Sequence, residues 1–196
     1  MNIIGITGGS GAGKSTVTAV WRRLGAVILD ADAVYRDVLG SNLPLQADLA
    51  ARFGNVLRDG ALDRKRLAKI VFSDKQALSD LNAMTHPYVI EAIRSLLDDQ
   101  RARGAAVCAI DAIYLLETEL RAICHPVVGV TCPVDQRVTR IIARDALNEE
   151  QARQRVKNQQ NDEYYRRHCD LILENTGDMA ALEQDAETLF RQIMEE

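Results

Sequence analysis

The chain contains 196 residues, of which 47% are hydrophobic, and its formal net charge is −4 at pH 7. This length and apolar content predict one globular domain with a full core and room for an inserted subdomain. The acidic balance argues against a nucleic-acid polymer as the main partner, and no apolar run is long enough to span a membrane. The four cysteines form no C-x-x-C pair, so we expect thiols in a reducing cytosol rather than a disulfide frame or a zinc site.

A glycine-rich stretch at residues 8–16 matches the phosphate-binding pattern G-x-x-x-x-G-K-[ST]. It follows an apolar, β-branched segment, residues 2–7, that predicts a buried strand, and it precedes apolar residues at helical spacing. Loop N–H groups and a helix start both attract a phosphate. The order of strand, glycine loop and helix therefore predicts a nucleotide site, in which Lys14 reaches the β- and γ-phosphates and Ser15 holds Mg²⁺.

Four further short apolar segments predict strands at residues 26–29, 105–110, 127–131 and 171–173. Helical patterns separate them. Five buried strands separated by helices predict an α/β fold with a parallel sheet covered on both faces.

Residues 43–104 show helical spacing throughout and predict a helical insertion without strands. Asp63 is expected to cap one helix of this insertion and Ser73 the next. Pro87 is expected in the first turn of a third, long helix, because proline lacks the N–H that an interior position would need.

Polar side chains follow the predicted strands, at the sheet edge where ligands bind in such folds. They are Thr7, Asp30, Asp32, Asp111 and Asn175. Asp32 could accept the proton of an attacking alcohol, and Asp111 could hold Mg²⁺ through water. Both aspartates could instead cap the following helices. Asn175 could read an adenine edge, and it fits a plain turn equally well.

Three arginines, Arg137, Arg140 and Arg144, follow the predicted fourth strand at helical spacing on one face. Such arginines can neutralise charge that develops on a transferred phosphoryl group, although a solvated charged face is the commoner fate of surface arginines. The polar segment after them is expected to be a lid that excludes water. The expected division is a core at 1–42 and 105–196, a helical acceptor-binding subdomain at about 43–104 and a lid at about 145–167.

A phosphate loop by itself indicates nucleotide binding and leaves the reaction open. The guanine-reading pattern Asn-Lys-x-Asp of GTPases is absent from the sequence, and the chain is short for a motor domain. The aspartates after the second strand favour phosphoryl transfer to a hydroxyl. A nucleotide-binding regulatory module without transfer activity is the alternative from a different class.

Several segments, in order along nearly the whole chain, resemble the dephospho-CoA kinase family. They are ITGGSGAGKST at 6–16, DAD at 30–32, LNAMTHP at 81–87, LLE at 115–117, Arg140 with Arg144-Asp145, Gln159, and DLILENTG at 170–177. Two features depart from the family pattern. Ile113-Tyr114 stand where the family has a proline-containing stretch, and the loop lacks the usual isoleucine. That loop also resembles uridine kinases, so a uridine-kinase-like or nucleoside monophosphate kinase is the alternative within the class.

The resemblance implies a P-loop kinase three-layer sandwich, with a five-stranded parallel sheet, a helical acceptor-binding insertion and a lid. It implies ATP-dependent phosphorylation of the ribose 3′-hydroxyl of dephospho-CoA, the final step of coenzyme A synthesis, with Mg²⁺. It further implies a cytoplasmic monomer or weak homo-oligomer, with small-molecule substrates and neither nucleic-acid nor membrane partners.

The resemblance and the strand-end pattern together give a set of expected site residues. The catalytic group is Asp32, Lys14, Arg140 and Arg144. The ATP-binding group is Gly11, Ala12, Gly13, Lys14, Ser15, Thr16 and Asn175. The acceptor-binding group is Thr7, Asp32, His86, Asp111 and Leu115. The Mg²⁺ ligands are Ser15 and Asp111.

Overall fold

A computed structural model describes residues 1–195 and divides the chain into two compact units. The first unit comprises Met1–Asp30 and Gln100–Glu196, and the second comprises Ala31–Asp99.

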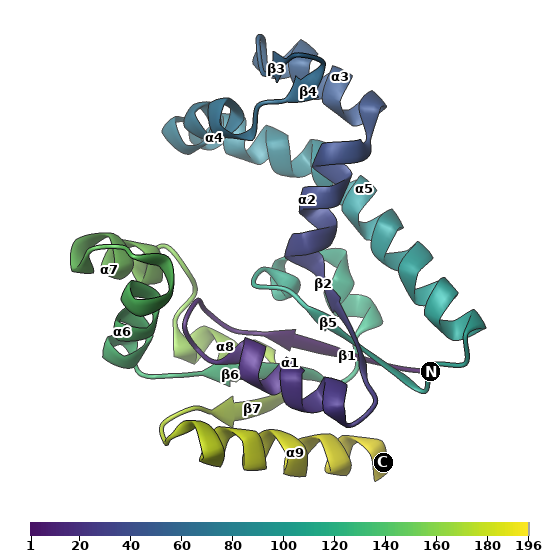
Figure 1. Ribbon diagram of the computed structural model, residues 1–196, viewed down its shortest axis with the longest axis vertical. Helices are drawn as coiled ribbons and strands as arrows, with labels where there is room; N and C mark the ends of the chain where they lie inside the picture. The colour runs from purple at the N-terminus through teal and green to yellow at the C-terminus, as the bar shows by residue number, and fades with distance from the viewer. Residues whose placement is uncertain (196) are drawn as a thin grey trace. The chain divides into compact units, whose positions relative to one another are not determined.

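A five-stranded parallel sheet forms the centre of the first unit (Figure 1). Its strands are β1 (Asn2–Thr7), β2 (Val27–Asp30), β5 (Val107–Asp111), β6 (Val127–Thr131) and β7 (Leu171–Glu174). Their order across the sheet is β2-β5-β1-β6-β7. All five predicted strands are therefore confirmed, with ends that differ by at most a residue or two, and so is the α/β fold class.

One face of the sheet is covered by α1 (Lys14–Arg23) and α9 (Met179–Glu195). Because side chains alternate along a strand, Ile4 and Ile6 of β1 share one core with these helices. Within it, the rings of Trp21 and Phe190 lie 5.8 Å apart, and Trp21 Nε1 donates to the carbonyl of Ala186 at 2.9 Å.

The opposite face is covered by η1 (Leu115–Glu117), η2 (Glu119–Ile123) and α8 (Asp162–His168). Gly5, between the two isoleucines of β1, adjoins the buried side chains of Leu115 and Cys124 there. Cover on both faces gives the three layers that the resemblance implies.

The remaining helices of the first unit are α6 (Val134–Asp145) and α7 (Glu149–Lys157). They share a small core of their own, made by Val138, Ile141, Ala152 and Val156. A capping box at Asn148 and Gln151 begins α7. The charged segment at 145–167 thus forms α7 and most of α8 rather than an irregular loop.

The second unit consists of α2 (Ala31–Ser41), α3 (Leu43–Phe53), α4 (Arg64–Ser73), most of α5 (Lys75–Ala102) and two very short strands. Asp63 caps α4, since its Oδ1 accepts a hydrogen bond from the backbone N–H of Arg66 at 3.0 Å. That cap was predicted and is confirmed.

The two short strands, β3 (Leu57–Arg58) and β4 (Ala61–Leu62), pair as an antiparallel hairpin. The prediction of a strand-free insertion is therefore wrong. Asp59 and Gly60 form the turn with φ values of 52° and 79°, and Asp-Gly is the dipeptide that a turn with two positive φ angles favours. The local signal was present in the sequence.

The start of α5 also differs from the prediction. Ser73 ends α4 instead of capping α5, and Asp74 accepts from the N–H of Gln76 at 2.8 Å. Pro87 lies inside α5, not in the first turn of a new helix. The buried face of α5 runs across the proline without a break: Ala77, Leu81, Thr85, Val89, Ile93 and Leu97. Burial of that continuous face explains why one helix forms despite a proline cost of about 3 kcal/mol.

Among residues 1–195, every helix is too short or too polar to cross a lipid bilayer.

Candidate active site

The glycine loop joins β1 to the N-terminus of α1. Within residues 1–195, no side chain caps this helix start. The backbone N–H groups of Lys14 and Ser15 therefore remain available to an anion, whereas that of Thr16 donates to the carbonyl of Gly13 at 3.0 Å. The helix dipole adds positive potential at the same place.

Asn175 supports the loop from the end of β7. Its Nδ2 donates to the carbonyl of Ala12 at 2.7 Å, and its own N–H donates to the carbonyl of Thr131 at 2.8 Å. A Cβ on Gly13, which has φ 111°, would lie 2.5 Å from that Nδ2, so only glycine fits there. The Asn175 carboxamide thus bonds to other residues of the protein. Its recognition of an adenine base stays a prediction.

Lys14 and Asp111 meet beside the loop. Lys14 Nζ lies 3.8 Å from Asp111 Oδ1, and the two side chains keep exposed fractions of 13% and 21%. Asp111 ends β5, where it is level with Ile6 of β1 and with Asp30 of β2. A strand-end carboxylate thus faces the ammonium group that the phosphate pattern provides.

The three arginines of α6 have three different environments. Arg140 donates to the carbonyl of Gly11 at 3.3 Å, to Asn175 Oδ1 at 3.3 Å and to Cys132 Sγ at 3.3 Å. Burial raises the pKa of the Cys132 thiol, which therefore stays neutral beside the guanidinium. The structure thus brings Arg140 to the phosphate loop.

Arg144 lies at the end of the same helix and points to solvent. Its guanidinium forms two hydrogen bonds with the carboxylate of Asp145, at 2.8 and 2.9 Å. Those hydrogen bonds hold the pKa of Asp145 below its usual value. The structure does not bring Arg144 to the loop, and its catalytic role stays a prediction.

Arg137 does not lie where its spacing in the sequence predicts. The helical spacing groups it with the phosphate-facing arginines, but the residue is 1% exposed and its Nε donates to the carbonyl of Ser10 at 3.0 Å. A signal was available, because Arg137 stands four residues before the buried Ile141 and so lies at the border of the apolar face.

Two predicted acceptor contacts, Thr7 and Leu115, are completely buried. Thr7 Oγ1 donates to the carbonyl of Ile113 at 3.0 Å, and Leu115 adjoins Gly5 under the sheet. In this structure both residues shape the segment that follows β5, and their contact with substrate stays a prediction.

Asp32 and His86 belong to the second unit. Helix α2 begins at Ala31, so Asp32 lies within its first turn rather than at the N-cap position. That placement argues against Asp32 as the N-cap residue of α2. His86 is half-buried within α5, next to Pro87.

A magnesium ion would find oxygen donors but no complete protein cage. Among residues 1–195, no group of three or more His, Cys, Asp or Glu residues could hold a metal. Mg²⁺ commonly takes one or two protein oxygens and completes its shell with water and substrate phosphates. The hydroxyl of Ser15 and the carboxylate of Asp111 are ligands of that kind, so the residues present fit the ion.

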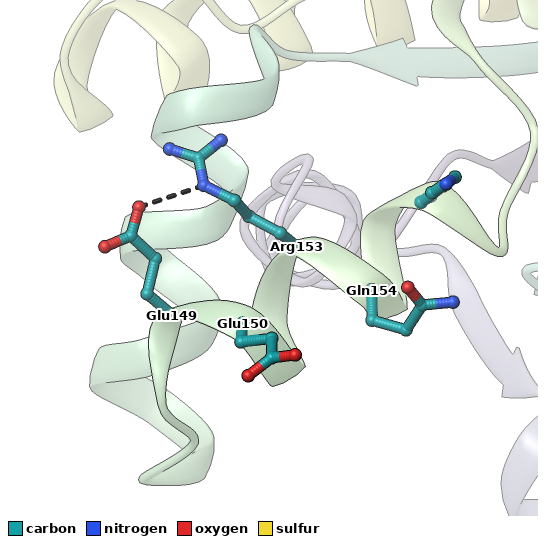
Figure 2. Close-up of a pocket in the computed structure, with 5 residues that line it drawn as sticks. Glu149, Glu150, Arg153 and Gln154 are labelled. Atoms are coloured by element: carbon teal, nitrogen blue, oxygen red, sulfur yellow. Dashed lines mark hydrogen bonds and ion pairs between the residues drawn. The ribbon is translucent and has the colours of Figure 1, made fainter.

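The pocket in Figure 2 lies on α7 and has a volume of about 500 Å³. Its lining residues are Glu149, Glu150, Arg153, Gln154 and Lys157, all exposed. Arg153 is engaged there by Glu149 at 2.9 Å and by Asp135 at 3.1 Å. This pocket is an open charged surface that contains none of the predicted site residues, so we place the candidate site at the glycine loop instead.

The chain is similar to known proteins over almost its whole length. A family model described as dephospho-CoA kinase matches residues 2–181. A dephospho-CoA kinase from Corynebacterium diphtheriae is 36% identical over 98% of this chain and 97% of its own length. One from Moorella thermoacetica is 37% identical over 98% of this chain and 92% of its own length.

Among solved structures, the crystal structure of TT1252 from Thermus thermophilus matches with a TM-score of 0.80 and 34% identity. The match covers 99% of this chain and 97% of that one.

Proposed function

Because the chain belongs to the dephospho-CoA kinase family, we propose that it transfers the γ-phosphoryl group of ATP to the ribose 3′-hydroxyl of dephospho-CoA. The observation that carries the assignment to phosphoryl transfer is the meeting of Lys14 and Asp111 beside an uncapped helix start. A basic side chain, an anion-binding backbone and a carboxylate that can serve a metal are the parts that this reaction needs.

The loop and its lysine act on the donor. Free N–H groups at the start of α1 bind the phosphate oxygens, and Lys14 offsets the negative charge on the β- and γ-phosphates. Charge on the leaving ADP grows as the bond between the γ-phosphorus and the bridging oxygen breaks. Arg140, held beside Gly11, adds a second cation near this charge.

Asp32 acts on the acceptor as the general base. The ribose oxygen forms the new bond to the γ-phosphorus while its proton passes to the Asp32 carboxylate, and ADP leaves with the electrons of the broken bond. The resemblance supports this role, as does the position of Asp32 in the first turn of α2, away from the N-cap.

Ser15 and Asp111 would hold Mg²⁺, which supplies further neutralisation of the phosphate oxygens when bound. We further propose that residues 43–104 bind the acceptor and that residues 145–167 form a lid. The helical character of the second unit and the separate small core of α6 and α7 support these two assignments.

The test is acceptor dependence. Purified protein is incubated with ATP and Mg²⁺, and with dephospho-CoA, uridine or a panel of nucleoside monophosphates. We expect stoichiometric ADP and coenzyme A with the first acceptor only. Faster transfer to uridine or to a monophosphate would contradict the proposed substrate, and ATP binding without transfer to any acceptor would indicate a regulatory nucleotide-binding protein.

A further inference from the structure

Ser10, in the middle of the glycine loop, is held by two side chains from distant parts of the chain. Its N–H donates to Gln159 Oε1 at 2.8 Å, and its Oγ accepts from Gln159 Nε2 at 2.8 Å. Its carbonyl accepts from Arg137 Nε at 3.0 Å. The N–H, the carbonyl and the hydroxyl oxygen of this one loop residue therefore each have a side-chain partner.

Arg137 and Gln159 also bond to each other. Arg137 donates from an Nη atom to Gln159 Oε1 at 3.0 Å, so that oxygen accepts from both the arginine and the loop. Asp162 Oδ1 lies 3.9 Å from the guanidinium. The three residues Ser10, Arg137 and Gln159 form one closed hydrogen-bond network, which we name the Ser10 network.

Stability alone does not account for a buried arginine at this place. A guanidinium is costly to remove from water, and well-packed apolar residues often replace a buried charge without loss of stability. Arg137 is 1% exposed on a helix whose neighbouring positions, Val138 and Ile141, are apolar. What an apolar residue could not do is hold a loop carbonyl and a glutamine oxygen together.

The loop backbone is shaped to receive this arginine. A Cβ on Gly9 would lie 2.0 Å from an Nη atom of Arg137. The guanidinium thus occupies the space that any other residue at position 9 would need, so the glycine and the arginine are matched to each other.

From these contacts we infer that Arg137 and Gln159 are positioning residues, which hold Ser10 and the phosphate-binding loop in the conformation that receives ATP. Neither acts on the substrate itself. Loop N–H groups stabilise developing charge only where they are oriented before the reaction starts. The Ser10 network bonds to the N–H and the carbonyl of Ser10. It therefore determines which other backbone N–H groups of the loop can bind the phosphates.

Gln159 lies between α7 and α8, within the segment that we propose as a lid. The loop is therefore held by the same stretch of chain that would close over the nucleotide. The catalytic consequence of this inference rests on the proposed kinase function, whereas the mechanical part, the holding of the loop, does not.

The test compares Gln159→Leu with Gln184→Leu, a matched control at an exposed position of α9, outside the proposed lid. We expect Gln159→Leu to speed amide hydrogen exchange in the loop peptide at 8–13 and to lower kcat by roughly tenfold to a hundredfold, the effect of a small misplacement. The KM for dephospho-CoA should not change. Gln184→Leu should match wild type in both measurements.

Gln159→Glu is the conservative variant. Its carboxylate keeps an acceptor for the Ser10 N–H and for Arg137, so it should restore most of the loop protection that Gln159→Leu loses. If Gln159→Leu fails to fold, Ser10→Ala removes only the Oγ contact and should still raise exchange in the loop by a smaller amount.

Loop exchange in Gln159→Leu equal to that of Gln184→Leu would overturn the inference, and so would faster exchange with an unchanged kcat. Failure of wild type to phosphorylate dephospho-CoA would instead overturn the proposed function. In that case hydrogen exchange and the Kd for ATP still decide whether the loop is held as inferred, because both should rise in Gln159→Leu but not in Gln184→Leu.

Discussion

The glycine loop and the helical unit Ala31–Asp99 are stabilised in opposite ways. Ser10 of the loop bonds to Gln159, which lies 149 positions away, and Ala12 bonds to Asn175, which lies 163 positions away. In the helical unit the side-chain bonds are mostly local: Asn42 caps α3 three residues on, and Asp63 does the same for α4. Local patterns can therefore build the helical unit, whereas the loop depends on tertiary contacts.

This difference predicts how substitutions should behave. Changes in the loop or its supports should affect nucleotide handling, and changes in the helical unit should affect stability. Apart from residues that contact the acceptor, Asp32 is the exception that we propose, because it belongs to the helical unit and acts in the reaction.

The largest expected effect tests that exception. Asp32→Asn keeps the size of the side chain but cannot take up a proton, so kcat should fall by about 10²–10⁴-fold. ATP binding and the unfolding temperature should stay close to wild type. The matched control is Asp37→Asn, at another exposed acidic position of α2, which should be fully active. Near-normal turnover by Asp32→Asn would remove it as the base and leave Asp30 and Asp111 as candidates.

The next effect tests the loop. Lys14→Ala removes the ammonium group beside Asp111, and the loss of one charge-stabilising group should lower kcat by about 10²–10³-fold. Circular dichroism should show an unchanged fold. Lys65→Ala, at an exposed position of α4, removes the same charge from the helical unit and should leave kinetics unaltered. Activity of Lys14→Ala at saturating ATP equal to that of Lys65→Ala would exclude Lys14 from the mechanism.

The next substitution, at Pro87 in the middle of α5, is expected to stabilise the protein. Pro87→Ala restores a backbone N–H to the helix and removes the clash of the ring, so it should raise the free energy of unfolding by about 1–3 kcal/mol. Urea unfolding measures the change. A lower free energy of unfolding in Pro87→Ala would mean that the packing of the proline ring stabilises the protein by more than the missing hydrogen bond and the ring clash cost it.

The fold was predictable because its signals are local. Each strand of the sheet is a short run of β-branched and apolar residues, as in Val127–Thr131, and the pattern alone placed all five. The dipeptide Asp59-Gly60 is also a local signal, and it favours a hairpin turn. The prediction missed this hairpin because strands of two residues contain no apolar run. Pro87 misled the prediction for the opposite reason, since a continuous buried face prevailed over a strong local breaker.

The site was predictable only in part, and the arginines of α6 show why. Arg137, Arg140 and Arg144 share one spacing and one predicted face. Because of packing against the loop, Arg137 is buried and Arg140 is half-buried, whereas Arg144 is exposed to solvent. The spacing of Arg137 from Ile141 points to its burial, but no local pattern separates Arg140 from Arg144, because that difference arises from where the loop lies in the folded chain.

The smallest expected effect tests whether the helical unit responds in stability alone. Asp63→Ala removes the cap of α4 and should lower the free energy of unfolding by about 1 kcal/mol, or the unfolding temperature by roughly 2–4 °C. Asp63→Asn keeps an oxygen that accepts from the N–H of Arg66, so its stability should stay near that of wild type. Turnover of dephospho-CoA should be the same for both variants and wild type. If Asp63→Ala lowered kcat while the unfolding temperature stayed constant, Asp63 would take part in the reaction although it is neither the proposed base nor a proposed acceptor contact, and the contrast between the two regions would be wrong.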